Sequence, residues 1–223
     1  MKSIKIFLLF SLMVMSILSQ EALGLTVTIN YYSGNPMYGG GPFLVTINDG
    51  TTVASFVTYC LEKNEYFTPG STYEATINPG AEEGGVGGGN PDPLDNKTKW
   101  LYANYLNDSL SSTLKMEGFQ YAIWAIENEI SPPPDDATGN YLDPTKYEYW
   151  FKYYYGLAQA NGGTDFGGIQ VLNLYVMGAN GNIITYVQSQ ISSVPEPGTL
   201  LLLGFGLVGI AMVARKKLKM RQH

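Results

Sequence analysis

Two apolar segments, one at each end of the chain, limit the part that can fold as a globular domain. Residues 1–24 have the pattern of a secretory signal peptide: Lys2 and Lys5 give a basic start, and the run 6–18 is apolar apart from serines. Small residues precede the cleavage that we expect after Gly24. An N-terminal membrane anchor is the alternative, but the run is short for a span and no basic stop follows it.

The C-terminal segment has the opposite charge arrangement. Residues 198–214 are apolar apart from Thr199 and glycines, and 17 residues are the lower end of what crosses a bilayer. Five Lys and Arg residues follow within 215–223. Because basic residues stay on the cytoplasmic side, the preceding domain is expected outside the cytoplasm. A buried core helix is the alternative, but it would not be followed directly by five basic residues.

In this order, the C-terminal features resemble the PEP-CTERM sorting signal over residues 195–223. The matching residues are the triplet Pro195, Glu196 and Pro197 and the basic stop Arg215, Lys216 and Lys217, on either side of the apolar segment. The resemblance implies an exosortase as partner, in a bacterium with an outer membrane and an exopolysaccharide matrix, as in a biofilm. It also implies at least transient anchoring by the membrane helix 198–214. It carries no information about the domain at 25–194.

The composition of the chain excludes several classes of function. The single histidine is His223, so residues 25–194 cannot assemble a Ser-His-Asp triad, a Cys-His dyad or a His-ligated zinc site. This region has 6 Lys, no Arg and 17 acidic residues, a net charge of −11. That balance argues against nucleic acid as a partner. No EF-hand loop is present, so the acids are interpreted as solvated surface, and no cofactor or metal is expected.

The hydrophobic pattern of residues 25–194 predicts strands, then helices, then strands, which is an α+β fold. Alternating apolar residues mark strands at 25–32, 42–47, 53–61, 72–77, 169–176 and 183–187. A glycine-rich stretch at 79–94 is interpreted as a flexible loop. Helices are predicted at 96–110 with Asp95 as N-cap, at about 115–130 with Pro132 ending it, and at 145–160.

The lone Cys60 has several interpretations. A lipid anchor requires the first mature residue, and a catalytic nucleophile would have no histidine to activate it. An intermolecular disulfide and a small buried hydrophobic residue without special chemistry both remain open.

A further interpretation of Cys60 comes from its sequence context. Tyr59, Cys60 and Leu61 match an aromatic-Cys-apolar motif, and residues 119–124 match an apolar-Gln-x-x-apolar-Trp motif. Together the motifs resemble bacterial thioester domains, which are surface adhesion modules. The resemblance implies an internal thioester cross-link between Cys60 and Gln120, and a β-sandwich-like body with an inserted helical segment, in agreement with the element order.

A thioester survives only where water is kept away. The neighbouring side chains expected to shield it are Tyr59, Phe119, Tyr121 and Trp124. An apolar stripe on the predicted helix is formed by Phe119, Ile123, Ile126 and Ile130. Gln120 lies beside this stripe and one helical turn from Trp124, so it can face the strand that carries Cys60. An ordinary amphipathic helix with a surface glutamine is the alternative for this motif.

The two resemblances together imply a secreted, exosortase-sorted surface or matrix protein that attaches covalently to a nucleophile such as an amine on a surface or matrix polymer. This would be a single event without enzymatic turnover. The alternative is a non-covalent structural or carbohydrate-binding matrix protein that uses its Tyr and Trp side chains as stacking platforms. A hydrolase is disfavoured: the pair Glu127 and Glu129 has i,i+2 spacing, which does not place two side chains face to face on a helix.

Overall fold

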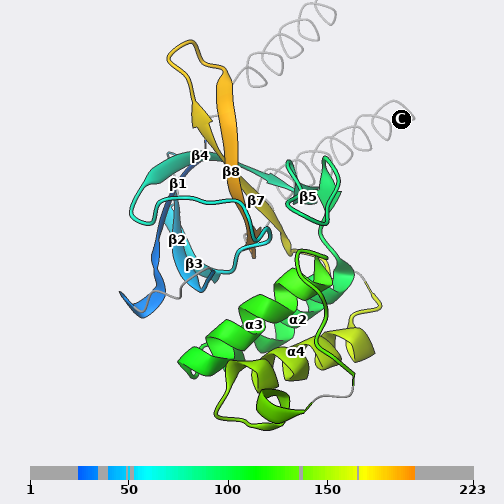
Figure 1. Cartoon of the computed structure of the whole chain (residues 1–223). Helices are drawn as coiled ribbons and strands as arrows, with labels where there is room; N and C mark the ends of the chain where they lie inside the picture. The colour runs from blue at the N-terminus through cyan, green and yellow to red at the C-terminus, as the bar shows by residue number, and fades with distance from the viewer. Residues whose placement is uncertain are drawn as a thin grey trace, which may run out of the picture.

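The computed structural model describes residues 25–34, 40–48, 50, 53–135, 138–164 and 166–193. The predicted signal peptide, the predicted sorting signal at 195–223 and the membrane helix expected at 198–214 lie outside these ranges. Within them, no helix combines the length and the apolar character needed to cross a membrane. The elements follow in the predicted order of strands, helices and strands (Figure 1). The α+β class is confirmed.

The strands form one six-stranded sheet in which every pairing is antiparallel, in the order β3-β2-β1-β4-β7-β8. Its members are β1 (Leu25–Tyr31), β2 (Phe43–Asn48), β3 (Val53–Thr58), β4 (Thr72–Asn78), β7 (Gln170–Met177) and β8 (Ile183–Ser192). In β1 and β2 the alternate residues Val27, Ile29, Val45 and Ile47 are buried, as the period of two requires when one face of a sheet packs inward.

The two edges of this sheet meet, which differs from the expected sandwich of two facing sheets. Just beyond β3, Cys60 forms an isolated antiparallel bridge with Gln190 of β8. The Leu61 N–H donates to the Ser189 carbonyl, and the Ile191 N–H donates to the Tyr59 carbonyl, both at 3.1 Å. A twisted sheet can bring its first and last strands together in this way, and their pairing satisfies edge groups that would otherwise be open.

Strand β8 is five residues longer than the predicted strand 183–187. The additional residues, 188–192, are polar apart from Ile191, yet all of them are buried. A polar strand gives no apolar alternation, which explains why the pattern missed it. The tip of the β7–β8 hairpin projects away from the helices, as Figure 1 shows.

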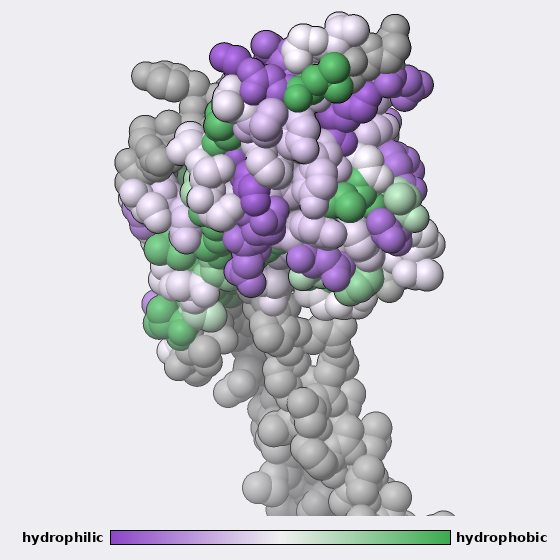
Figure 2. Space-filling model, turned by 90° about the horizontal axis from the view of Figure 1, so that it is seen from below, coloured by the Kyte–Doolittle hydropathy of each residue, from purple (hydrophilic) through white to green (hydrophobic). Residues whose placement is uncertain are grey.

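The three helices are inserted between β4 and β7 and form a layer below the sheet (Figure 1). They are α2 (Asn96–Ser109), α3 (Thr113–Ile126) and α4 (Tyr147–Asn161). A short 3-10 helix at Gly139–Leu142 lies between α3 and α4, and another at Tyr32–Gly34 follows β1. Seen from below, in Figure 2, the surface is mainly hydrophilic with scattered apolar residues. The apolar sides of the helices therefore face inward.

Helix α3 is the central helix, with nine of its fourteen residues buried. It contributes to two apolar clusters: Phe119 and Ile123 belong to the one among the helices, and Trp124 to the one inside the sheet. Gly118 allows α4 to approach, because a Cβ at this position would lie 2.5 Å from Cβ of Trp150. Helix α3 is thus held between the sheet and α4.

The capping of the helices was predicted in part. Asp95 caps α2 as expected, accepting a hydrogen bond from the Lys97 N–H at 2.7 Å. The prediction that α3 runs to about residue 130 is wrong. The helix ends at Ile126. Two residues later Asn128 adopts a positive φ of 64°, and the Glu129 N–H donates to the Trp124 carbonyl at 2.8 Å. This is a Schellman ending, which stops the helix before Pro132.

The glycine-rich stretch 79–94 is closed by a two-stranded sheet, β5 (Gly80–Ala81) paired with β6 (Asp92–Pro93). Glu129 connects it to the rest of the domain, because its carboxylate accepts the Gly87 N–H at 3.0 Å and the Lys63 N–H at 2.9 Å. This stretch is therefore tied to the segment that follows Cys60.

Candidate functional site

Cys60 lies where the two edges of the sheet meet, and only 1% of it is exposed. The hydrogen bonds on either side of the Cys60–Gln190 bridge belong to the neighbouring residues, so Cys60 and Gln190 are a non-hydrogen-bonded pair. In such a pair the side chains approach closely, while each residue's own N–H and C=O point away from the partner strand. The Cys60 peptide groups are therefore available to another partner.

That partner is the side chain of Gln120, which is fully buried on α3. Its Nε2 donates to the Cys60 carbonyl at 2.8 Å, and its Oε1 accepts the Cys60 N–H at 3.0 Å. The carboxamide thus takes the place of a neighbouring strand along Cys60. The structure brings together the two residues of the predicted cross-link, which are 60 positions apart in the sequence.

The Gln120 oxygen has a second backbone donor. The Gly41 N–H donates to Oε1 at 2.8 Å, so two N–H groups converge on one carbonyl oxygen. Two backbone donors at this range are the arrangement that stabilises the negative oxygen of a tetrahedral intermediate in acyl transfer. They also polarise the carboxamide, which makes its carbon a better target for a nucleophile.

The segment that supplies this donor, at Gly40 and Gly41, was not among the predicted site residues. A Cβ on Gly40 would lie 2.5 Å from Cγ and 2.9 Å from Cδ of Gln120, and one on Gly41 would lie 3.0 Å from Cα of Tyr59. Only glycines allow the backbone so close to the Gln120 and Tyr59 positions. The run of three glycines before Pro42 was the available signal, because consecutive glycines often mark a close backbone approach.

The Cys60 thiol is held in its neutral form. Burial raises the pKa of this thiol far above its ordinary value, and hydrogen bonds from the Gln190 side chain and the Gly41 backbone lower it only in part. The negative charge of Glu62 raises it further. A thiol in such surroundings differs from the thiolate of a cysteine hydrolase, which sits in an electropositive and partly exposed environment.

The four residues expected to shield the site divide between the two sides of the sheet edge. Trp124, 2% exposed, shares the apolar cluster of Cys60, and Tyr121 packs against both clusters. Tyr59 and Phe119 pack against each other in the cluster among the helices, with ring centroids 4.8 Å apart. The reason is the alternation of an extended chain, which turns Tyr59 and Cys60 to opposite sides. Tyr59 and Phe119 therefore pack on the side of the strand that faces the helices, while the sulfur lies on the opposite side, which they do not cover.

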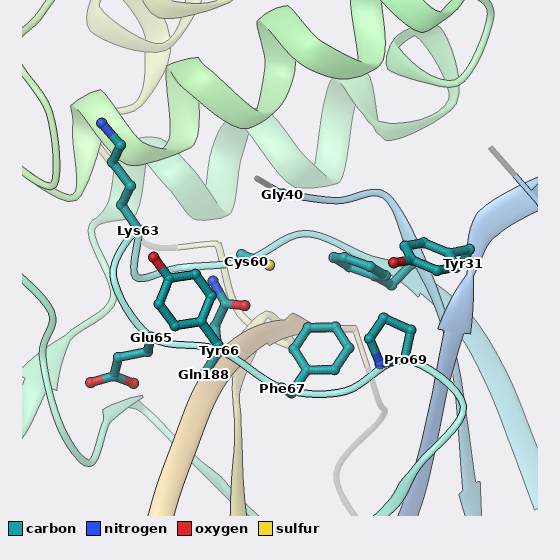
Figure 3. A pocket seen from close by; sticks show the side chains of 10 residues that line it. Tyr31, Gly40, Cys60, Lys63, Glu65, Tyr66, Phe67, Pro69 and Gln188 are labelled. Carbon is teal, nitrogen blue, oxygen red and sulfur yellow. The ribbon is translucent and has the colours of Figure 1, made fainter. Parts of the chain in front are cut away.

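A pocket of about 190 Å³ opens beside the sulfur (Figure 3). It is lined by Tyr31, Gly40, Phe43, Cys60, Lys63, Glu65, Tyr66, Phe67, Pro69 and Gln188. Figure 3 shows the segment 63–69 crossing one side of the pocket, with Cys60 between it and the strand that carries Tyr31. The pocket gives a small molecule or a protruding group a route to the interior near Cys60.

Two carboxyl groups near this pocket, those of Glu62 and Glu65, are protonated more readily than usual. Burial raises the pKa of Glu62 to about 9, with contributions from Glu65 and Glu129. Burial also raises the pKa of Glu65 to about 7, with the charges of Glu83 and Glu129 adding to it. Among the described residues, no group of three or more His, Cys, Asp or Glu side chains could hold a metal ion.

The pair Glu127 and Glu129 has structural partners. Glu127 accepts the Asp95 N–H at 3.3 Å, while Glu129 holds the backbone of Lys63 and Gly87. Both residues lie beyond the end of α3 and bind different segments, so they do not flank a common space as glycosidase carboxylates do.

Comparison with known protein families identifies one match, the PEP-CTERM protein-sorting motif, over residues 193–217. A search of curated proteins finds no match. The motif indicates a protein that is targeted to an exosortase and acts outside the cytoplasm, at the cell surface or as a secreted protein. It lies C-terminal to the site just described and does not include any of its residues.

Proposed function

We propose that this exosortase-targeted protein forms an internal thioester between Sγ of Cys60 and Cδ of Gln120, and uses it once to attach to an amine on a surface or matrix polymer. The observation that supports this most is the Gln120 oxygen, which accepts the N–H groups of Gly41 and Cys60 at 2.8 and 3.0 Å. In the same proposal, the exosortase processes the protein in a bacterium with an outer membrane, and the attachment contributes to its extracellular matrix.

Formation of the bond requires no cofactor. The Cys60 sulfur attacks Cδ of Gln120, and the negative charge that develops on Oε1 is stabilised by the two N–H donors. The C–N bond then breaks, and the amide nitrogen leaves as ammonia with the thiol proton. The product is a thioester, and the domain has lost one molecule of ammonia.

In the attachment step sulfur is the leaving group and a nitrogen is the nucleophile, the opposite of the step that forms the thioester. An amine entering through the pocket attacks Cδ, and the same donors again hold the oxyanion. The C–S bond breaks, its electron pair goes to Sγ, and a proton from the amine nitrogen neutralises the thiolate. The Gln120 acyl group is then an amide of the partner, and nothing regenerates the thioester, so the protein does not turn over.

The charge of the domain supports an amine as the nucleophile, and the burial of the site supports the stability of the thioester before the amine arrives. The domain has a net charge of −11, which attracts cationic partners such as alkylammonium groups and repels anionic polymers. Cys60 and Gln120 are 1% and 0% exposed, so bulk water has little access to the reacting atoms. Access comes through the pocket, where the partner's amine must enter.

The test is the mass of freshly prepared domain that has never been exposed to amines. We expect it to weigh less than its sequence mass by one ammonia and to have no titratable thiol while folded. Methylamine should then add to Gln120 and release the Cys60 thiol in equal amount. Cys60→Ala and Gln120→Ala should each abolish the reaction, while Gln159→Ala on the exposed side of α4 should leave it unchanged. A full sequence mass in this sample contradicts the thioester.

The second candidate is non-covalent binding of a matrix polysaccharide. It is favoured by the aromatic side chains at the mouth of the pocket, where Tyr66 is 76% and Tyr31 43% exposed. Exposed aromatic rings offer flat apolar surfaces for stacking. A denaturing wash separates the two functions: a covalently attached protein stays on the polymer, while a non-covalently bound one is released. If binding is non-covalent, Tyr66→Ala should weaken retention on the polymer, while Cys60→Ala should leave it unchanged.

A further inference from the structure

Gln190 is a buried glutamine that contacts the sulfur of Cys60. It is 0% exposed, and its Nε2 lies 3.6 Å from Sγ of Cys60, within the range of a hydrogen bond to sulfur. The same nitrogen donates to the Gln188 carbonyl at 3.4 Å. Because a carbonyl oxygen accepts and does not donate, this second contact fixes the orientation of the amide with its N–H side toward the sulfur.

The register of the strands determines this contact. Cys60 and Gln190 are the two members of a non-hydrogen-bonded antiparallel pair, where directly opposed side chains come closest. On its other side Gln190 is paired with Leu172 of β7. The glutamine therefore stands between an apolar strand and the sulfur, at a position where an aliphatic side chain would pack well.

Keeping an amide at this position has a cost. Within the described part of the chain, Oε1 of Gln190 is buried and has no hydrogen-bond partner. An unsatisfied buried acceptor destabilises a folded protein, because the hydrogen bond that it makes to water in the unfolded state is lost. Such groups are rare, and a catalytic role is one of the accepted reasons for them.

We propose that Gln190 is a catalytic residue of the attachment reaction, in which its Nε2–H stabilises the negative charge that develops on the Cys60 sulfur as the C–S bond breaks. This inference rests on the proposed thioester. The electron pair of the bond goes to Sγ, which the amide N–H holds until the proton from the attacking amine arrives. The Gly41 and Cys60 N–H groups stabilise the oxygen, and Gln190 stabilises the leaving group.

The surroundings of the sulfur explain why a donor is needed. Burial raises the pKa of the Cys60 thiol, and the charge of Glu62 raises it further, so the thiolate is a poor leaving group here. A hydrogen bond to a charged group contributes about 1.5–3 kcal/mol, which corresponds to roughly ten- to a hundredfold in rate.

The test replaces Gln190 with methionine, which has a similar length but no N–H. The rate at which methylamine releases the Cys60 thiol should fall by roughly ten- to a hundredfold. The released thiol should also be alkylated several-fold more slowly by iodoacetamide at a fixed alkaline pH, because less of it is in the reactive thiolate form. Glu62 is present in both proteins, so the difference reports the amide alone. Gln170→Met, a half-buried residue on β7, is the matched control and should change neither quantity.

The outcomes separate this inference from the function on which it rests. If Gln190→Met carries a smaller fraction of thioester, mass spectrometry still gives the release rate for the fraction that has it. Unchanged rates of thiol release and thiol alkylation in this variant, together with a wild-type domain that has lost ammonia, would overturn the role of Gln190 and leave the thioester standing. A purely structural role would lower the melting temperature and leave both quantities at their wild-type values. A wild-type domain of full sequence mass removes both proposals.

Discussion

The close approach of Gly40 to Gln120 gives a direct test of the site geometry. In Gly40→Ala the new Cβ would lie 2.5 Å from Cγ, 2.9 Å from Cδ and 3.0 Å from Oε1 of Gln120. Since ordinary carbon contacts are about 3.5 Å or more, the side chain must shift by about 1 Å. Its bonds to the Gly41 and Cys60 N–H groups, now 2.8 and 3.0 Å, would lengthen to about 4 Å and cease to be hydrogen bonds.

The magnitude follows from the groups left without partners. Two backbone N–H groups would be buried and unsatisfied, at about 1–3 kcal/mol each, and relaxation of the segment before Pro42 would recover part of this. We expect the free energy of unfolding to fall by about 2–4 kcal/mol. The loss of ammonia should also be abolished or strongly reduced, because both oxyanion donors are displaced together.

Urea denaturation measures the free energy of unfolding, and the intact mass measures the loss of ammonia. The matched control is Gly156→Ala in α4, where a new Cβ has no atom within 4 Å. Alanine is the better helix former, so this variant should gain up to about 1 kcal/mol and keep the wild-type mass. A Gly40→Ala protein with wild-type stability and complete loss of ammonia would refute the reasoning.

Three further predictions concern other parts of the molecule. Gly118→Ala should lower the free energy of unfolding by about 1–3 kcal/mol in urea, because its Cβ would lie 2.5 Å from Cβ of Trp150 and 2.7 Å from the Phe151 nitrogen; equal stability would show that α3 and α4 can separate freely. The pKa of Glu62 is raised from 4.5 to about 9, so the folded state holds a proton that the unfolded state has released, and the melting temperature should fall as the pH rises through this window. Glu62→Gln should flatten that decline in circular dichroism melts, and an unchanged slope would assign it to other groups. Deletion of residues 195–223 should misplace the protein in cell fractionation, and an unchanged location would remove the sorting role of the tail.

Local sequence patterns were sufficient for the order of the elements and for singling out Cys60 and Gln120, whose contact the structure shows. The alternation in 25–77 and the N-cap at Asp95 act within a few residues, so they can be recognised without knowledge of the fold. The motifs around Cys60 and Gln120 are also local. The sorting signal is a linear signal, and the family comparison recovered it from residues 193–217.

The tertiary structure decided how these residues act together. Gly41, Cys60, Gln120 and Gln190 come from four separate segments, and they meet because the edges of the sheet pair in one register. A shift of that register by one residue would turn Gln190 to the other face of the sheet. Residues 188–192 of β8 are buried and polar apart from Ile191, so no apolar period marks them. The Cys60 N–H can donate to Gln120 because Cys60 and Gln190 of this strand form a non-hydrogen-bonded pair. Hydrogen bonds between distant segments depend on the closure of the sheet, and local sequence patterns carry no record of that closure.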